Sequence, residues 1–302
     1  MGIFSKLYYY TWNIGFIESN VKDVILSEEQ DVHVNWVKHT YKDRFFADPF
    51  ILSIDDNAIS VLVEDYPYYD KSGMISLLTI DRKDYTLLNR QEVLKKPFHM
   101  SYPFIQRNGE GGVKWVAPEA SMSGNLYRYT IDPETNMLVN PEILVHEPLL
   151  DSTIVEYNGK FWLFCTKRGE NANDRLYIYY SDSPEGEWLP HKANPVVVDA
   201  ASARPAGSVV EIEGCFYRVI QNCKNHYGES VRVSKIETLT ETTFKESYVK
   251  EIRAQKDRFS HGFHTINGVG DMCVVDALCK EFAPFRRLWF ELRNTLNQIW
   301  GK

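Results

Sequence analysis

A segment pattern recurs five times along this chain, and this repeat constrains the fold more than any other sequence feature. Each unit opens with a polar or small residue beside a short apolar run, and the openings lie 50 to 58 residues apart. They begin at Asp48, Tyr102, Ser152, Ala206 and His264. Repeats of this length are typical of β-propellers, in which each repeat forms one four-stranded blade.

A tight-turn signal follows the opening of each unit. The first turn is Asp55-Asp56-Asn57, and the later ones are Asn-Gly or Glu-Gly pairs. Asn-Gly between apolar runs is typical of β-hairpins, because both residues tolerate a positive φ. A second apolar run then returns the chain to its starting level, so the start of one strand and the end of the next share one end of the unit. Five hairpins around one axis would gather these mostly polar positions at one mouth.

We therefore predict an all-β fold, a five-bladed β-propeller over residues 1–277. Its lead-in covers residues 1–43, and its blades start near residues 48, 102, 152, 206 and 264. The fifth repeat is truncated, so a strand predicted at Tyr8–Ile17 is expected to complete it and close the ring. A C-terminal amphipathic helix is predicted over residues 278–302.

The helix prediction rests on an apolar stripe at helical spacing within residues 284–302. Its basic residues lie off the stripe. Such a helix either packs on the propeller or lies on an anionic membrane, and the sequence leaves both readings open.

Composition limits the possible partners. The net charge of −7 argues against nucleic acid, because phosphate backbones are bound by excess Lys and Arg. No apolar run approaches the ~20 residues that span a bilayer, and the N-terminus lacks a signal-peptide core. The five cysteines are an odd number and are expected to stay reduced. We therefore expect a cytoplasmic protein, with residues 284–302 as the candidate peripheral membrane contact.

Seven motifs at the unit openings and strand ends resemble one known family. They are Phe46–Phe50, Ser101–Pro103, Ala117–Glu119, Asp151–Thr153, Ala203–Gly207, Gln221–Gly228 and His264–Thr265. Together they resemble the N-terminal propeller of plant glucosamine inositolphosphorylceramide transferases and of bacterial polysaccharide-locus relatives, from about Trp12 to Asp276. That domain is similar to the five-bladed furanosidase propellers, such as arabinanases, xylosidases and invertases. The resemblance implies three carboxylates, in the first, third and fourth blades, and Asp48 and Asp151 match the first two.

The third carboxylate is missing. Where a furanosidase has its acid Glu, this chain has Ala203–Gly207, which contains no carboxylate. Glycoside hydrolysis needs a proton for the departing sugar oxygen, whereas a phosphate leaving group needs positive charge. Arg204 can supply that charge, because a guanidinium binds phosphate through two parallel hydrogen bonds. This favours a glycosyltransferase or phosphoglycosyltransferase acting on an activated donor.

Residue chemistry and the resemblance together assign candidate roles. Asp48 is expected to be the base that deprotonates the acceptor hydroxyl, or else a nucleophile. Asp151 would orient sugar hydroxyls or tune Asp48, because neighbouring carboxylates push their pKa values apart. Glu119 would be a second acid or base, or a hydroxyl ligand. The expected substrate-binding residues are Arg44, Glu64, Tyr102, Lys167, Arg204, Gln221 and His264.

Several of these residues also have structural explanations. Asp48-Pro49 is common turn chemistry, Glu119 can cap its blade, and Arg204 can be the ion-pair partner of Asp151. His264 can serve only to close the ring. No metal-ligand spacing and no Gly-rich phosphate loop is present, so no cofactor is assigned and a divalent ion stays open.

Three function classes remain open from sequence. The first is a transferase of surface polysaccharide or glycolipid synthesis that uses a nucleotide sugar or sugar pyrophosphate and a glycan or lipid-linked acceptor. The second is a furanosidase-like hydrolase with Glu119 as acid, and the third is a non-catalytic glycan-binding propeller.

Overall fold

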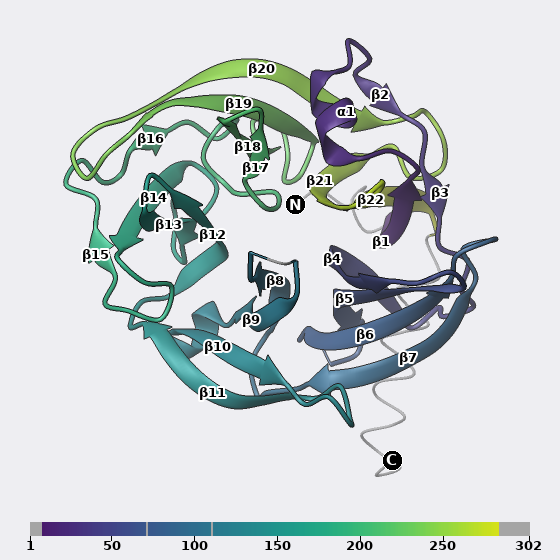
Figure 1. The fold of residues 1–302 in the computed structure, drawn as a ribbon. Helices are drawn as coiled ribbons and strands as arrows, with labels where there is room; N and C mark the ends of the chain where they lie inside the picture. The colour runs from purple at the N-terminus through teal and green to yellow at the C-terminus, as the bar shows by residue number, and fades with distance from the viewer. Residues whose placement is uncertain (1–7, 71, 110, 284–302) are drawn as a thin grey trace.

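The computed structural model describes residues 8–70, 72–109 and 111–283. In it, five β-sheets are arranged around one central axis, each with its strands stacked outward from the centre (Figure 1). The predicted all-β fold and five-bladed propeller are therefore confirmed. The described part of the chain contains only one short α-helix, α1 (Val21–Leu26), and one short 3-10 helix, η2 (Ser121–Ser123).

Blades 1 to 4 are each built on an antiparallel meander of consecutive strands. Blade 1 contains β4 (Arg44–Ile54), β5 (Ala58–Pro67), β6 (Met74–Asp81) and β7 (Leu87–Leu94). Blade 2 contains β8 (Ser101–Arg107), β9 (Val113–Glu119), β10 (Leu126–Ile131) and β11 (Leu138–Val145). Blade 3 contains β12 (Leu149–Tyr157), β13 (Lys160–Lys167), β14 (Arg175–Ser181), β15 (Leu189–Pro190) and β16 (Val197–Val198). Blade 4 contains β17 (Val210–Ile212), β18 (Cys215–Asn222), β19 (Ser230–Leu239) and β20 (Phe244–Ala254), with β2 (Asp31–Val32) paired in parallel at its outer edge.

Blade 5 combines the two ends of the described chain. Its strands are β21 (Gly262–Val269), β22 (Met272–Phe282), β1 (Tyr8–Ile17) and β3 (Asn35–Trp36). β1 pairs with β22 along its whole length, from Tyr8 opposite Phe282 to Ile17 opposite Cys273. The expectation that Tyr8–Ile17 completes the fifth blade is therefore confirmed, and this pairing closes the ring.

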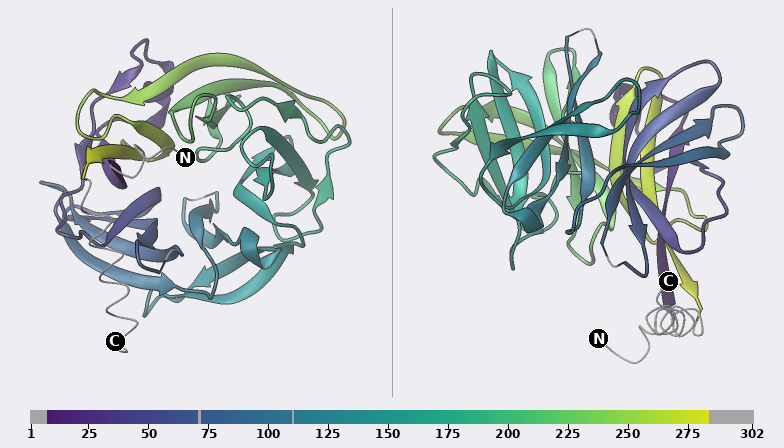
Figure 2. Two further views of the ribbon diagram at one scale, coloured as in Figure 1. Left: turned by 180° about the vertical axis from the view of Figure 1, so that it is seen from behind. Right: turned by 90° about the horizontal axis from the view of Figure 1, so that it is seen from below.

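One predicted boundary is wrong. β22 continues to Phe282, so residues 278–282, which the sequence assigned to the C-terminal helix, form a strand. These residues pair with Tyr8–Trp12, and the ladder hydrogen bonds stabilise the extended conformation there. β1 and β22 extend together beyond one side of the ring (Figure 2, right). The remaining part of the helix prediction, residues 284–302, lies outside the described residues, and no described helix is long and apolar enough to cross a bilayer.

Apolar side chains hold neighbouring blades together. Between blades 5 and 1, for example, Ile14 and Val274 pack against Phe46 and Val61, and all four are buried. Each such side chain contributes about 1.5–3 kcal/mol of transfer free energy when it is buried. This packing fixes the first strand of every blade relative to its neighbours, and those strands carry the candidate site.

Candidate functional site

β-bulges at the start of the innermost strands create the site. In β4, β8 and β12, two residues lie opposite one on the next strand, and a similar shift follows Phe263 in β21. The first bulged residues, Asp48, Tyr102 and Asp151, have φ values of 49°, 41° and 49°. Such a conformation costs of order 1–3 kcal/mol for a residue other than glycine and is often found at functional sites. We call the end of the ring where these bulges lie the mouth.

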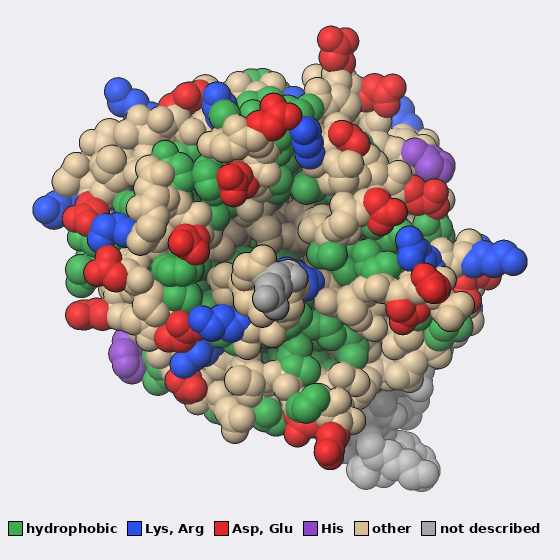
Figure 3. All heavy atoms as spheres, in the orientation of Figure 1, with side chains coloured by type: hydrophobic (Ala, Val, Ile, Leu, Met, Phe, Trp, Pro, Cys, Tyr) green, Lys and Arg blue, Asp and Glu red, His purple; other side chains and the backbone are tan. Residues whose placement is uncertain are grey.

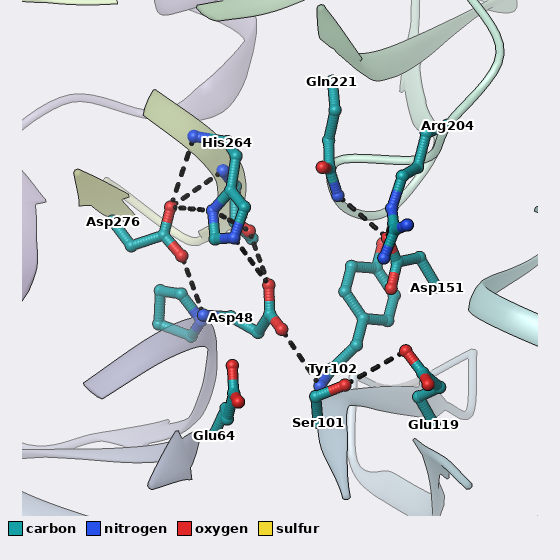
Figure 4. Close-up of polar contacts among 12 residues, drawn as sticks. Asp48, Glu64, Ser101, Tyr102, Glu119, Asp151, Arg204, Gln221, His264 and Asp276 are labelled. Atoms are coloured by element: carbon teal, nitrogen blue, oxygen red, sulfur yellow. Dashed lines mark hydrogen bonds and ion pairs between the residues drawn. The ribbon is translucent and has the colours of Figure 1, made fainter. Parts of the chain in front are cut away.

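A hydrogen-bonded cluster surrounds Asp48 (Figure 4). One carboxylate oxygen of Asp48 accepts from the Thr265 hydroxyl at 3.0 Å, and the other accepts from the Tyr102 backbone N–H at 3.3 Å. His264 Nε2 lies 3.6 Å from Asp48 Oδ1, and His264 Nδ1 is 2.6 Å from Asp276 Oδ1. The cluster forms a row from Asp276 through the imidazole to Asp48.

Burial and neighbouring charges shift the pKa values of Asp48 and His264 upward. Burial raises the pKa of Asp48 to about 7; the positive charge of His264 opposes this, and the charge of Asp151 adds to it. Burial lowers the pKa of His264, but the hydrogen bond to Asp276 and the charges of Asp276, Asp48 and Asp151 together raise it above its usual value. Asp48 is therefore able both to take up and to release a proton near pH 7, as a general base requires.

Asp151 organises a second cluster, on the other side of the mouth. Its Oδ2 accepts from Arg204 Nε at 2.6 Å and from the Gln221 side-chain amide at 2.9 Å. Arg204 also donates from Nη1 to the Asn173 side-chain oxygen at 3.0 Å, and its guanidinium lies over the Tyr227 ring. Among the described residues, no hydrogen bond engages Arg204 Nη2, so this edge of the guanidinium can bind a substrate oxygen.

Two more carboxyls complete the mouth. Glu119 accepts from the hydroxyls of Ser101 at 3.1 Å and Ser121 at 2.7 Å. Burial, followed by the charge of Asp151, raises the pKa of Glu119 to about 7. Burial also raises the pKa of Glu64 well above its usual value, and the charge of Asp48 adds to this. Near neutral pH, both groups can therefore carry a proton.

The structure brings together most of the predicted site residues. Figure 4 shows Asp48, Glu64, Glu119, Asp151, Arg204, Gln221 and His264 around one space at the mouth. Tyr102 is also present, but its side chain is fully buried and its hydroxyl is 2.9 Å from the Thr153 hydroxyl. Tyr102 therefore supports the site through its backbone N–H rather than by offering its hydroxyl to a substrate.

Two predicted cations do not join these clusters. Arg44 forms ion pairs with Asp65 and Asp43, and Lys167 forms one with Glu147. Sequence spacing placed both beside the motifs, but their acidic partners come from neighbouring segments of the same blades and could not be identified from the repeat.

Three supporting residues are not among the predicted site residues. Asp276 lies in β22, and its carboxylate contacts His264 Nδ1 and orients the ring. Trp12 lies in β1, and its ring stacks on His264 at 4.0 Å with an interplanar angle of 17°. Arg218 is 1% exposed and donates to Glu246 and to the backbone oxygens of Ser202 and Ala203. It thereby supports the segment that carries Arg204.

The cluster around Asp276 is a poor fit for a resident metal ion. Ligand atoms of Asp48, His264 and Asp276 lie within 4.8 Å of one another. However, the Asp276 oxygens already accept from three backbone N–H groups, those of Asp48, His264 and Thr265, and contact His264 Nδ1. Coordination would compete with these bonds, so the donor chemistry favours a hydrogen-bonded network.

Gly207 allows the segment carrying Arg204 to pass close to β21. Its φ is 152°, and a Cβ there would lie 2.1 Å from the Ile266 carbonyl oxygen. Gly207→Ala is therefore expected to lower the free energy of unfolding by ~2 kcal/mol or more, because the backbone must shift. Gly109→Ala is the matched control, since a Cβ there meets nothing within 4 Å. Thermal unfolding measures both, and equal midpoints would contradict the close approach.

The fold is a five-bladed β-propeller whose mouth gathers several carboxyl groups, one imidazole and one guanidinium. Residues 33–272 match the family described as glucosamine inositolphosphorylceramide transferase 1, N-terminal, and the chain belongs to that family. The Arabidopsis thaliana glucosamine inositolphosphorylceramide transferase 1 is 34% identical over 234 residues, covering 75% of this chain and 29% of the relative. The Oryza sativa subsp. japonica protein of the same name is 34% identical over 213 residues, covering 68% of this chain and 28% of the relative. The chain thus matches less than a third of the length of these relatives.

Solved structures share the fold at low sequence identity. The catalytic domain of the Coprinopsis cinerea GH62 α-L-arabinofuranosidase superposes with a TM-score of 0.60 at 9% identity, covering 83% of this chain and 84% of that one. The Podospora anserina α-L-arabinofuranosidase gives 0.53 at 8% identity, covering 82% and 94%. At these identities the similarity establishes the architecture alone.

Proposed function

We propose that this chain is a glycosyltransferase that moves a sugar from a phosphate-activated donor to a glycan or lipid-linked acceptor in surface-glycan or glycolipid synthesis. The family supports a transferase, since its curated relatives carry that name, but the chain matches only part of their length. The observation that carries the proposal is the guanidinium of Arg204 at the mouth of blade 4, bound to Asp151 at 2.6 Å. This is the blade in which the resemblance to furanosidases implies a proton-donating carboxyl.

In this mechanism Asp48 is the base. The acceptor hydroxyl attacks the anomeric carbon, its proton moves to Asp48, and the bond between that carbon and the phosphate oxygen breaks. The bonding electrons leave with the phosphate, so negative charge develops on its oxygens. Arg204 Nη2 can donate to that charge, and fixed donors of this kind typically contribute a factor of ~10²–10³ to the rate. Asp151 and Gln221 hold the guanidinium in place.

A screen of activated sugars tests the proposal. The protein is incubated with nucleotide sugars and sugar pyrophosphates, with and without glycan acceptors, and released phosphate, pyrophosphate or nucleotide is measured. Acceptor-dependent release from at least one donor is expected. Release of sugar from unactivated glycosides, with no acceptor-dependent release from any donor, would instead support hydrolysis.

Hydrolysis is the second candidate because of one observation. Burial raises the pKa of Glu119 to about 7, so this residue can be protonated at neutral pH, as a glycosidase acid must be. A binding propeller without turnover is the third candidate, and Glu119 and Asp48 would then only bind hydroxyls.

The pH profile of transfer tests the role of Asp48. Because the base must be deprotonated and its pKa is raised to about 7, kcat/KM should rise with pH through that region and then level off. The charge of His264 lowers the pKa of Asp48, so His264→Gln should move this rise to higher pH. Lys245→Glu, on the exposed surface of β20, is a control that should leave the profile unchanged. A His264→Gln profile that coincides with the wild-type profile would show that another group limits the rate.

A further inference from the structure

A large pocket lies beside the mouth, between blades 5 and 1. Its volume is about 1030 Å³. Its walls come from β1, from the segment joining β3 to β4, from the residue after β5 and from the loop before β21. Trp12 lines this pocket and also stacks on His264 at 4.0 Å, so one side chain separates the pocket from the Asp48 cluster.

The pocket differs from the mouth in charge. Four cationic side chains line it, Lys38, Lys42, Arg44 and Arg258, and none of its described lining residues is Asp or Glu. Arg44 is paired with Asp43 and Asp65, and Arg258 is paired with Glu281. Lys38 and Lys42 have no ion-pair partner among the described residues. This lining is unusual in a chain with 41 acidic and 34 basic residues. It favours an anionic ligand over a neutral sugar, whose hydroxyls would donate to carboxylates.

The pocket is also rich in aromatic rings. Trp36 and Phe259 lie 4.9 Å apart, and Tyr41 packs under the Arg44 guanidinium at 5.3 Å. Flat rings and guanidinium groups offer stacking surfaces, which contribute ~1–3 kcal/mol for a nucleic-acid base. The lining therefore fits a planar aromatic group attached to phosphate.

Two polar atoms in the wall have no hydrogen-bond partner among the described residues. They are Asn13 Oδ1 and His39 Nδ1, both of them buried. Asn13 is 5% exposed, and its amide nitrogen donates to the Val37 carbonyl at 2.9 Å, which fixes the side chain. Buried polar atoms normally have partners, so hydrogen bonding in this part of the wall is incomplete.

The mouth offers few cations to a whole activated donor. Arg204 and His264 lie there among Asp48, Glu64, Glu119, Asp151 and Asp276 (Figure 4), and Arg204 is already paired with Asp151. Arg204 Nη2 can contact the phosphate next to the sugar, but the rest of a nucleoside phosphate needs partners outside the mouth. Figure 3 views the opposite end of the ring, where acidic and basic side chains are interspersed and form no separate basic patch.

We propose that the pocket between blades 5 and 1 binds the nucleotide part of the donor, while the sugar lies at the mouth. Because Trp12 lies next to both sites, one extended donor can reach from the pocket to Asp48. This inference rests on the proposed transferase function and adds to it that the activating group is a nucleoside phosphate.

Calorimetric titration of the full chain with nucleoside mono- and diphosphates tests the inference, and inorganic pyrophosphate is the comparison probe. At least one nucleoside phosphate should bind, and pyrophosphate should bind at least ~10-fold more weakly because it cannot stack. The double variant Lys38→Glu/Lys42→Glu should bind that nucleotide at least ~10-fold more weakly, because two attractive charges become repulsive. Lys192→Glu/Lys245→Glu makes the same change in net charge away from the pocket and should bind within about twofold of wild type.

Three results would overturn the inference: no nucleoside phosphate binds, the pocket variant binds like wild type, or pyrophosphate binds as tightly as the nucleotides. The last result would indicate a site for phosphate groups in general, such as the diphosphate of a lipid carrier. The proposed function fails separately. Asp48→Asn should keep nucleotide binding and lose transfer. If the wild-type protein transfers sugar but binds no nucleotide, only the inferred nucleotide pocket is refuted. If nucleotide binds but Asp48→Asn transfers sugar at the wild-type rate, only the role of Asp48 as base is refuted.

Discussion

Replacing Asp48 with Asn is expected to lower the transfer rate by ~10²–10⁴-fold, the usual contribution of a general base. Asn has nearly the same shape but cannot accept the acceptor proton. The substitution should cost little stability, because burial already raises the pKa of Asp48 to about 7 and much of it is neutral near pH 7. Steady-state transfer assays measure the loss, and circular dichroism establishes that the variant is folded.

The donor affinity of Asp48→Asn separates catalysis from binding. If Asp48 acts as the base, donor binding should stay close to the wild-type value while turnover is lost. A folded variant that transfers sugar at the wild-type rate would exclude Asp48 as the base. Full loss of donor binding would indicate instead that Asp48 mainly holds the sugar.

Replacing Arg204 with Gln should have the second large effect, on both stability and rate. Arg204 and Asp151 form a mostly buried ion pair, with side chains that are 11% and 3% exposed. Removing one partner of such a pair typically costs ~3–5 kcal/mol, because the remaining charge stays buried. Loss of the donor to the leaving group should reduce turnover by a further ~10²–10³-fold. Chemical denaturation and transfer assays measure the two effects.

Two further variants distinguish the roles of Arg204. Arg204→Lys keeps a charge beside Asp151 but loses the forked geometry, so it should recover stability more than turnover. The double variant Asp151→Leu/Arg204→Met removes both charges and should recover stability without activity. If Arg204→Lys restored turnover as fully as stability, a forked contact to the leaving group would be ruled out.

The repeat predicted the architecture because each unit contains its own local signals. Turn pairs such as Asn158-Gly159 mark the hairpin ends, and they have the positive φ that such turns require. Truncation of the fifth unit predicted that Tyr8–Ile17 completes the ring. The length of β22 was not predictable in this way, because residues 278–282 are strand only through pairing with β1, which lies at the other end of the chain.

The site was predictable where a local signal exists. Pro49 and Pro103 follow Asp48 and Tyr102, and proline within a strand indicates a bulge or an edge. Asp276 carries no such signal, and its role depends on contacts with Asp48 and His264 across blades 1 and 5. Lys167 was predicted as a substrate-binding residue because it lies beside a motif, but its ammonium group forms an ion pair with Glu147. Side-chain pairing between strands decides these cases, and a single sequence does not specify it.

The leaving-group dependence of sugar release tests whether Arg204 takes the place of a glycosidase acid. Rates are measured for one sugar attached to a phosphate group and for the same sugar attached to an alkyl group, each with the acceptor that supports transfer. Because Ala203–Gly207 contains Arg204 and no carboxylate, we expect turnover of the phosphate-activated sugar and no detectable release from the alkyl glycoside. Comparable rates for the two compounds would contradict it and would assign Glu119 as the acid of a hydrolase.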